Sequence, residues 1–281
     1  MITWIVIVAN VLFSLQGFNN RIFFEKNLFQ IDPILRGKEY IRLITSTLLH
    51  ANYIHLGLNM YVFFTFVGMI QTNFSQYGIL NVYTGSLIGG NLLALYIHRN
   101  HGSYRAVGAS GAVSGIVYAS ILLNPDMGLT LLIFPIASIP GWLFGILYIL
   151  YTIFGIHKQS GNIGHEAHLG GAIAGLIITI LYYPSLLSEQ GLLITGMLVP
   201  TLVFLFIIVR YPEFRITGKL SKLGKLGRFN KFKLPQSERK KSIRDTENIE
   251  RAELNRILDK INQRGMNSLS SEERDFLNTY R

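Results

Sequence analysis

Long apolar runs without charge alternate with short polar or turn-forming clusters over residues 1–209 of the chain. A helix needs about 20 mostly apolar residues to cross the roughly 30 Å hydrocarbon core of a bilayer. Breaker clusters at 71–73, 124–126 and 188–190 separate several of the runs. The pattern predicts seven membrane-spanning helices, over residues 2–18, 53–71, 78–97, 108–124, 141–157, 168–183 and 191–209.

Three segments of this pattern need separate interpretation. The first run has no basic residue before it and no small-residue cleavage pattern after it, so we expect a retained helix. Residues 19–52 are rich in aromatic side chains and too long for a turn, which favours an ordered element at the membrane surface. Residues 129–140 contain Pro135 and Pro140, which exclude a regular helix, and we expect an interfacial loop leading to Trp142.

Charge is concentrated at the C-terminal end of the chain. Residues 1–209 contain 8 Lys and Arg against 6 Asp and Glu, whereas residues 210–281 contain 18 against 10. About a quarter of the residues in a soluble domain are charged, so the first part excludes a soluble globular enzyme and a pure nucleic-acid-binding protein. The absence of cysteine excludes disulfides, thiolate metal sites and cysteine nucleophiles. The fold class that follows is an all-α polytopic membrane protein.

A few polar side chains lie inside the apolar spans, where burial is costly and often marks function. Asn59, Ser110 and His168 stand in the second, fourth and sixth spans, which run in the same direction. At 1.5 Å per residue they lie about 18, 21 and 22 Å from the ends at which these spans leave the membrane. One layer, roughly 10 Å below one surface, therefore collects a hydroxyl, an imidazole and an amide. His55 is four residues before Asn59 and shares its helix face.

These groups can supply the chemistry of acyl transfer. A serine hydroxyl needs a base to act as a nucleophile, and Ser110 with His168 provides such a pair. Attack on an amide creates an oxyanion, for which His55, Asn59 and the backbone N–H of Ser110 are candidate donors. No carboxylate lies at the right depth to orient His168, since Glu166 is two residues away and on another helix face. The sequence therefore favours a Ser–His dyad over a triad.

Each feature alone also has a purely structural explanation. Gly108, Gly111, Gly171 and Gly175 are typical of closely packed membrane helices, and a helical serine commonly bonds its own backbone. A histidine in a span can be a hydrogen-bonded core residue or a proton-relay element, and an asparagine can join two helices. Metal binding is a weak alternative because no carboxylate accompanies the histidines. We expect neither a metal site nor a cofactor.

Three motifs follow one another along the chain. They are H-x4-H-x3-N ending at Asn59, G-x-S-G at 108–111, and A-H-x-x-G-x-x-x-G at 167–175. In this order and spacing they resemble the rhomboid family of intramembrane serine proteases, over roughly residues 1–185. The resemblance implies a six-helix core with the serine on a short fourth helix, a Ser–His dyad, and cleavage of transmembrane substrates near their extracytoplasmic ends.

The resemblance also implies roles at the matching positions of the site. Ser110 is the nucleophile, His168 is the general base, and His55 and Asn59 join the Ser110 backbone as oxyanion donors. The resemblance also implies that the glycines of the two motifs allow the fourth and sixth helices to pack closely. These glycines are Gly108, Gly111, Gly171 and Gly175.

Further from the dyad, the resemblance concerns the first loop and the fifth span. Glu39 and Arg42 match an E-x-x-R element whose arginine organises the first loop. Trp142 and Phe144 would line a lateral gate for substrates.

One position departs from the family pattern. Four residues after the nucleophile, the family often has an aromatic residue that stacks on the catalytic histidine, whereas this chain has Ser114. Tyr118, one turn further on, is the nearest aromatic residue in sequence, and the sequence leaves open whether it substitutes.

The chain beyond residue 185 carries three further segments. We expect a seventh transmembrane helix at 186–209, containing Pro200, then a basic juxtamembrane linker at 210–244 and a small helical module at 245–281. The linker has 12 basic against 2 acidic residues, and beside a membrane it would bind anionic lipid at about 1 kcal/mol per basic residue. A solvated linker is the alternative, and no nucleic-acid partner is expected because no recognition motif is present.

The last segment reads as a helical hairpin. Leu254, Ile257, Leu258 and Ile261 form one helical face, and Ser270–Glu273 is a capping box. The hairpin resembles a small C-terminal module of some bacterial rhomboids. Seven spans place this tail on the side of the active-site loops, which by resemblance face outward, whereas the positive-inside tendency favours the cytoplasm. The two arguments leave the side of the tail open.

Two classes of function follow from these observations. The first is an intramembrane serine endopeptidase of a bacterial inner or plasma membrane, acting on transmembrane segments with small, helix-breaking residues, because an intact helix shields its carbonyl carbons. The second is a non-proteolytic scaffold or chaperone that binds transmembrane helices, against which the presence of both Ser110 and His168 argues. A transporter is disfavoured because no inverted repeat is visible.

Overall fold

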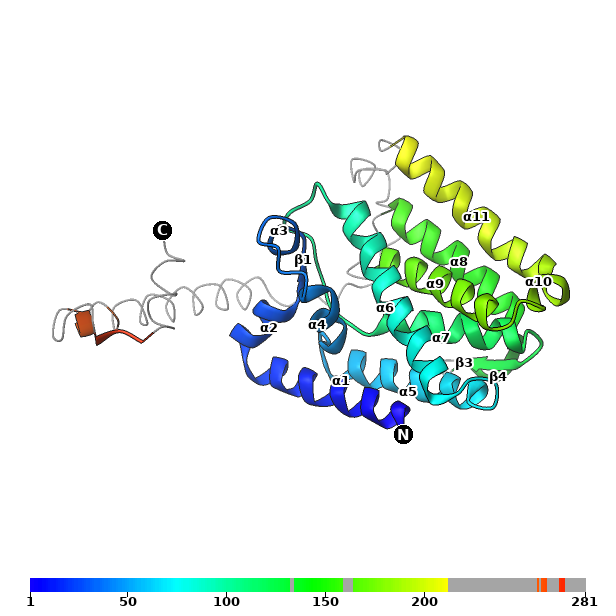
Figure 1. Ribbon diagram of the computed structural model, residues 1–281, viewed down its shortest axis with the longest axis horizontal. Coiled ribbons are helices and arrows are strands. Elements are labelled where there is room, and N and C mark those ends of the chain that lie inside the picture. The colour runs from blue at the N-terminus through cyan, green and yellow to red at the C-terminus, as the bar shows by residue number, and fades with distance from the viewer. Residues whose placement is uncertain (132–133, 159–163, 212–256, 258, 262–267, 271–281) are drawn as a thin grey trace. The chain divides into compact units, whose positions relative to one another are not determined.

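The computed structural model describes residues 1–131, 134–158, 164–211, 257, 259–261 and 268–270. The chain divides into two units, Met1–Ser221 and Lys222–Arg281. The first unit contains all the helices and strands labelled in Figure 1.

Seven apolar helices build the first unit, in agreement with the predicted spans. Six are long and apolar enough to cross a membrane: α1 (Ile2–Asn19), α5 (Tyr53–Ile70), α6 (Gln76–His98), α8 (Gly141–Lys158), α9 (His165–Tyr182) and α11 (Gly191–Arg210). The seventh, α7 (Ser110–Leu123), has 14 residues. A short helix, α10 (Leu186–Glu189), joins α9 to α11. The protein is a multi-pass membrane protein.

The short helix α7 lies at the centre of the unit. It packs against α5, α6, α8 and α9 (Figure 1), and every residue from Gly111 to Leu122 is buried. At 1.5 Å per residue, α7 is only about 21 Å long, which is less than the thickness of the bilayer core. One end of α7 therefore has to lie below a membrane surface.

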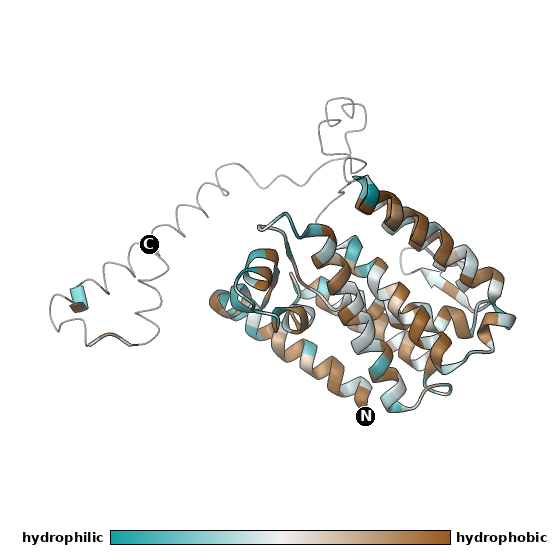
Figure 2. Cartoon of the chain, turned by 45° about the horizontal axis from the view of Figure 1, so that its top comes forward, coloured by the Kyte–Doolittle hydropathy of each residue, from teal (hydrophilic) through white to brown (hydrophobic). Residues whose placement is uncertain are grey.

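The outer helices differ from this core in what they expose. Of the six long helices, α1 and α11 bury the smallest share of their residues and α6 and α9 bury more. Figure 2 shows α11 as hydrophobic along most of its length. Apolar side chains on all faces of an outer helix are expected where lipid, and not water, is the solvent.

Facing glycines allow α7 and α9 to approach closely. A Cβ atom on Gly171 would collide with the carbonyl oxygen of Gly111, and one on Gly175 would collide with that of Gly115. These contacts are the close packing predicted for Gly111, Gly171 and Gly175. Gly108 differs from them because it precedes α7, where its positive φ of 128° disfavours any other residue.

The segment after α1 is ordered, as its aromatic content predicted. It contains α2 (Arg21–Asn27), β1 (Phe29–Gln30), α3 (Ile31–Leu35) and α4 (Arg42–Leu48), and β1 pairs antiparallel with β2 (Arg105–Ala106). The β1–β2 pairing joins the first loop to the loop that leads to Ser110.

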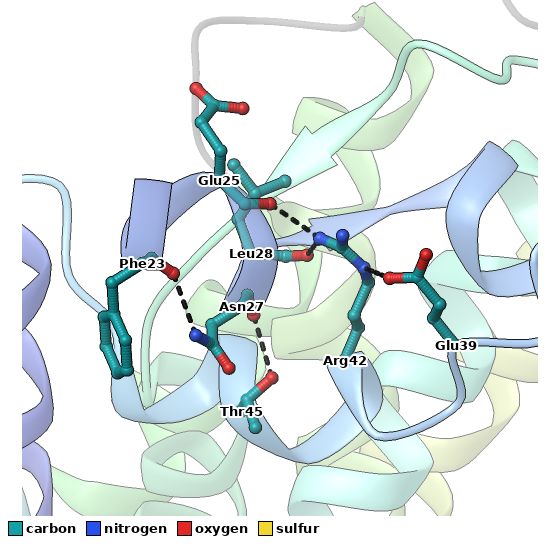
Figure 3. A network of polar contacts seen from close by, with 7 residues as sticks. All are labelled: Phe23, Glu25, Asn27, Leu28, Glu39, Arg42 and Thr45. Atoms are coloured by element: carbon teal, nitrogen blue, oxygen red, sulfur yellow. Dashed lines mark hydrogen bonds and ion pairs between the residues drawn. The ribbon is translucent and has the colours of Figure 1, made fainter. Parts of the chain in front are cut away.

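Arg42 holds this segment together from its centre. Its guanidinium donates to the carbonyl oxygens of Glu25 at 2.7 Å and Leu28 at 3.0 Å and to the Glu39 carboxylate at 2.6 Å (Figure 3). The side chain is buried, so its charge needs these partners. The planar guanidinium spreads its five N–H donors over three nitrogens, so that Nε meets the carboxylate while Nη1 meets both carbonyl oxygens.

The structure corrects the interfacial loop expected over residues 129–140. This stretch is a two-stranded antiparallel hairpin of β3 (Gly128–Leu131) and β4 (Phe134–Pro140). Proline excludes a helix but is tolerated in an edge strand, and a two-stranded sheet consists only of edge strands. The argument against a helix was therefore right, and the inference of an irregular loop was wrong.

Most of the tail predictions lie outside the described residues. This applies to the linker at 212–244 and to Leu254, Leu258 and Glu273. Of the predicted apolar face, Ile257 and Ile261 are described, both are helical, and Ile257 is buried.

Candidate active site

Ser110 is the first residue of α7, which is enclosed by its neighbouring helices. The first N–H groups of a helix have no partners within the helix, and the helix dipole makes this end positive. Two backbone N–H groups hold the preceding loop: Gly108 N donates to Ser46 O at 3.0 Å, and Ala109 N donates to the side-chain His50 Nε2 at 3.4 Å. The hydroxyl therefore stands at a fixed point with positive electrostatic potential.

The structure brings His168 of α9 to this hydroxyl. His168 Nε2 lies 2.6 Å from Ser110 Oγ, across 58 residues of sequence. Both side chains are half-buried. A distance of this size suits transfer of the serine proton to the imidazole.

The other ring nitrogen of His168 contacts a tyrosine that none of the sequence motifs includes. Tyr148 of α8 places its hydroxyl 3.0 Å from His168 Nδ1, and the two rings are stacked with centroids 6.2 Å apart and planes at 21°. A sequence signal existed, since Tyr148 stands four residues after Phe144 and shares its helix face.

The position without the family's aromatic residue has a different function here. The Ser114 hydroxyl donates to the carbonyl oxygen of Ser110 at 2.8 Å. Tyr118 is fully buried, and its hydroxyl donates to Gly145 O at 2.7 Å. The described ring contact of Tyr118 is with Tyr148, at 6.3 Å. Tyr118 therefore supports Tyr148, and Tyr148 is the residue that stacks on His168.

His55 lies against the loop before Ser110. A Cβ atom on Gly108 would lie 2.7 Å from His55 Cε1, 3.0 Å from His55 Nε2 and 3.7 Å from Ser110 Oγ, so the imidazole and the hydroxyl flank the same glycine. His55 Nδ1 accepts a hydrogen bond from Ala51 N at 3.4 Å. The proton of the neutral ring is therefore on Nε2, which makes this nitrogen a donor beside Ser110.

Asn59 lies one turn further along α5 and is buried. Its Nδ2 donates to the carbonyl oxygen of His55 at 2.9 Å. An amide nitrogen carries two hydrogens, and this bond uses one of them. The structure thus places Asn59 on the His55 face of α5, as its spacing predicted.

His50 is buried beneath the same loop. Ser14 Oγ donates to Leu48 O at 2.8 Å and lies 2.9 Å from His50 Nδ1. Because the serine proton is used on Leu48, His50 Nδ1 carries the hydrogen and Nε2 accepts from Ala109 N. Burial, with repulsion from His55, lowers the pKa of His50 to about 3, against the effect of its backbone hydrogen bond at Leu48. His50 is therefore a neutral structural link between α1 and the Ser110 loop.

Glu166 points away from the Ser110–His168 pair, as its position two residues from His168 predicted. Its Oε1 lies 2.8 Å from His98 Nε2 of α6, and both residues are buried. Tyr104 stacks on His98 at 3.6 Å. Burial, and then the Glu166 charge and hydrogen bond, raise the pKa of the Tyr104 hydroxyl above its usual value. This polar cluster joins α6 to the first turn of α9.

The two expected gate residues lie at the start of α8. Trp142 is 40% exposed. Phe144 is half-buried and stacks on Tyr148 with centroids 5.7 Å apart and planes at 12°. Phe144 is thereby connected to His168 through a single ring.

The fold and this geometry define a class of protein. It is a multi-pass membrane protein in which a serine begins an enclosed short helix and an imidazole lies on the serine hydroxyl. The chain belongs to the rhomboid family, because residues 37–185 match the family model described as the Rhomboid domain. Residues 244–281 match a second model, described as a family of unknown function, DUF6576.

Individual relatives come from bacteria and from organelles. RHOMBOID-like protein 12, mitochondrial, of Arabidopsis thaliana is 29% identical over 184 residues, covering 60% of this chain and 54% of the relative. Rhomboid protein 1, mitochondrial, of Saccharomyces cerevisiae is 27% identical over 185 residues, covering 60% and 52%. Rhomboid protease GlpG of Haemophilus influenzae is 31% identical over 144 residues, covering 50% and 68%. The chain thus spans about half the length of the first two relatives.

Proposed function

We propose that the protein is an intramembrane serine endopeptidase that hydrolyses peptide bonds in or near transmembrane segments of other membrane proteins. The observation that carries this proposal is the 2.6 Å contact between Ser110 Oγ and His168 Nε2 at the first residue of the enclosed helix α7. Membership of the rhomboid family and similarity to relatives named as proteases support it.

The reaction begins with Ser110. His168 Nε2 takes the hydroxyl proton as Ser110 Oγ attacks the carbonyl carbon of the substrate peptide bond. The carbonyl oxygen becomes an oxyanion, which the Nε2–H of His55, the free amide hydrogen of Asn59 and the N–H of Ser110 would stabilise. The positive end of the α7 dipole favours the same negative charge.

The second half of the reaction releases both products. The tetrahedral intermediate collapses, the C–N bond breaks, and His168 gives its proton to the leaving amine. Water then attacks the acyl group on Ser110, with His168 acting again as base, and the acid product leaves. Each turnover consumes one water and restores both side chains.

The substrate class follows from the depth of Ser110. A peptide bond inside an α-helix is shielded by its neighbours, so the substrate has to unwind before its carbonyl carbon can be attacked. Transmembrane segments with glycine or other small, helix-destabilising residues near the active-site end are the substrates we propose. Arg42 and Glu39 would shape the first loop beside the entry, and Trp142 and Phe144 would line it.

The finer assignments belong to the same proposal. We place the protease core at 1–185 and assign the protein to a bacterial inner or plasma membrane, on the resemblance of residues 245–281 to a module of bacterial rhomboids. The linker at 210–244, with 12 basic against 2 acidic residues, would bind anionic lipid.

Cleavage and active-site labelling test the proposal together. In proteoliposomes, the wild-type protein should cleave a single-span model substrate and react with a fluorophosphonate, and Ser110→Ala should lose both activities by at least about a thousandfold. Ser188→Ala, an exposed serine in α10, is the matched control and should retain both. Equal cleavage by wild type and Ser110→Ala over several substrates would overturn the proposal. Substrate capture without cleavage, unchanged in Ser110→Ala, would favour a non-proteolytic scaffold.

A further inference from the structure

A tyrosine on the helix of the expected gate contacts the imidazole of the proposed dyad. We propose that Tyr148 is a positioning residue for His168, whose hydroxyl accepts the Nδ1–H of the ring and keeps Nε2 directed at Ser110. The inference rests on the proposed function and assigns the orientation of the base to α8.

The direction of the hydrogen bonds follows from the chemistry. To accept the Ser110 proton, His168 Nε2 must be unprotonated, so the hydrogen of the neutral ring is on Nδ1. Nδ1 lies 3.0 Å from the Tyr148 hydroxyl, whose oxygen then acts as the acceptor. The tyrosine's own hydrogen needs a further acceptor.

Ser114 supplies that acceptor. Its side chain is a hydrogen-bond partner of Tyr148, and its own hydrogen is donated to Ser110 O at 2.8 Å. A hydroxyl has one hydrogen and can accept as well, so Tyr148 donates to Ser114 Oγ. The resulting series runs from His168 to Tyr148, to Ser114 and to the backbone of Ser110, and each hydroxyl both donates and accepts.

Packing fixes the Tyr148 ring between its neighbours. Phe144 stacks on it at 5.7 Å and His168 at 6.2 Å. Tyr118, which is fully buried, contacts it at 6.3 Å and bonds the backbone of α8 at Gly145, three residues earlier. A side chain held in this way can hold another in turn, which is how partners of a reactive group usually set its geometry.

The small side chain at position 114 is part of this arrangement. Ser114 is 5% exposed and contacts the Tyr148 hydroxyl. The ring that stacks on the histidine therefore comes from α8, and α7 contributes a hydroxyl. Because Phe144 and Tyr148 lie on one helix, any displacement of the gate end of α8 would also disturb the hydrogen bond to His168.

Removal of one oxygen tests the inference. Tyr148→Phe keeps the stacked ring and removes the acceptor, so kcat for a single-span substrate and the rate of fluorophosphonate labelling should both fall, by about 10- to 100-fold. KM should stay within about threefold, because the hydroxyl acts on the base and not on substrate binding. Tyr151→Phe is the matched control on the same helix. Tyr151 is exposed and its ring contacts those of Tyr148 and His165, so the substitution keeps these ring contacts and should retain wild-type kcat.

A second variant separates positioning from folding. Ser114→Ala leaves both rings in place and should lower kcat by about two- to fivefold, and adding it to Tyr148→Phe should cause little further loss, because both act through one series of hydrogen bonds. Thermal unfolding of each variant shows whether the fold is intact. If Tyr148→Phe is unfolded, the kcat of Ser114→Ala becomes the test. An unchanged kcat in Ser114→Ala would then overturn the inference.

The inference and the proposed function fail differently. Wild-type kcat and labelling in Tyr148→Phe, with Ser110→Ala inactive, would disprove the role of Tyr148 and leave the protease proposal standing. Wild-type protein that neither cleaves nor reacts with the fluorophosphonate would disprove the proposed function itself.

Discussion

At the scale of single residues, one uncharged imidazole supports the loop before Ser110, the proposed nucleophile, without contacting the serine side chain. The ring of His50 joins Ser14 of α1 to the backbone of Ala109, the residue before Ser110. Ser14 at Nδ1 and the Ala109 N–H at Nε2 both require the neutral form with its hydrogen on Nδ1. Protonation would turn Nε2 from an acceptor into a donor facing the Ala109 N–H. Acid should therefore weaken the link between α1 and the active-site loop.

This arrangement predicts a pH dependence of stability. In the unfolded chain His50 binds a proton near its ordinary pKa of 6.5, whereas in the folded protein its pKa is lowered to about 3. The unfolded state binds more protons between these values, so the contribution of His50 to the free energy of unfolding is complete above 6.5 and is lost as the pH falls toward 3. The loss should amount to a few kcal/mol at most, at about 1.4 kcal/mol per pKa unit.

His50→Asn is the variant that isolates this contribution. Its side chain does not titrate, so thermal unfolding in detergent should show a less stable protein at about pH 7.5 but a smaller further loss on acidification. Carboxylates titrate equally in both proteins, so their contribution cancels in the difference between the two stability curves. Parallel stability curves for wild type and His50→Asn would contradict the assignment.

At the scale of elements, the distance between α7 and α9 determines whether the two groups of the proposed dyad meet. Ser110 and His168 lie on different helices, and their 2.6 Å contact exists only at the separation that the glycine pairs permit. Gly111 and Gly171 lie within one turn of Ser110 and His168, respectively. Backbone atoms cannot move aside as a flexible side chain can, so this contact does not tolerate a Cβ atom.

Gly171→Ala tests this dependence. The added methyl group would collide with the Gly111 carbonyl oxygen and force the helices apart, at a cost of about 1–3 kcal/mol or more in the free energy of unfolding. Proteolysis and fluorophosphonate labelling should fall at least tenfold, because displacements near 1 Å cost about a hundredfold in rate. Thermal unfolding and labelling measure the two effects.

Gly68→Ala on α5 is the matched control for that experiment. A Cβ atom at Gly68 would meet nothing within 4 Å, so both stability and activity should remain near wild type. Equal behaviour of the two variants would show that glycine packing does not set the α7–α9 distance.

At the scale of the whole molecule, the number of passes determines which ends share a side. Helices α8, α9 and α11 follow one another in alternating directions, so α11 ends beside the end of α8 that lies next to the start of α9 (Figure 1). With α11 as a seventh pass, Arg210 and the chain after it leave on the side of the loops around Ser110. The basic tail favours the cytoplasm by its charge, and so the topology and the charge rule still make opposite predictions if those loops face outward.

Two reporter fusions test the pass count without assuming which side is outside. A reporter after Ser188, in a chain truncated before α11, and a reporter after Arg281 of the complete chain should lie on opposite sides of the membrane. Protease protection in oriented vesicles measures each side. If both reporters lie on the same side, α11 does not cross the membrane and the seventh span is wrong.

The sequence predicted the membrane spans of this protein better than the contacts between them. The seven apolar runs predicted the seven apolar helices of ten or more residues that the structure describes, since backbone groups in lipid must pair within a helix and so length and hydropathy are informative. The hairpin at 128–140 was missed because proline excludes a helix without indicating which strand pairs with which. The Arg42 network could be anticipated only as an element that organises the loop, since two of its three acceptors are backbone carbonyls that no side-chain pattern reveals.

The sequence by itself determined that this protein lies in a membrane, and it predicted that Asn59, Ser110 and His168 lie in one layer, because depth along a helix is a one-dimensional quantity. Position along the chain does not tell how each helix is rotated about its axis or which helices lie beside it. Only the tertiary structure decided these two properties. It put Tyr148 on the imidazole, used Ser114 as a hydroxyl partner and turned Glu166 to His98. These contacts depend on which faces of α6, α7, α8 and α9 meet, and glycine packing between backbones decides that for α7 and α9.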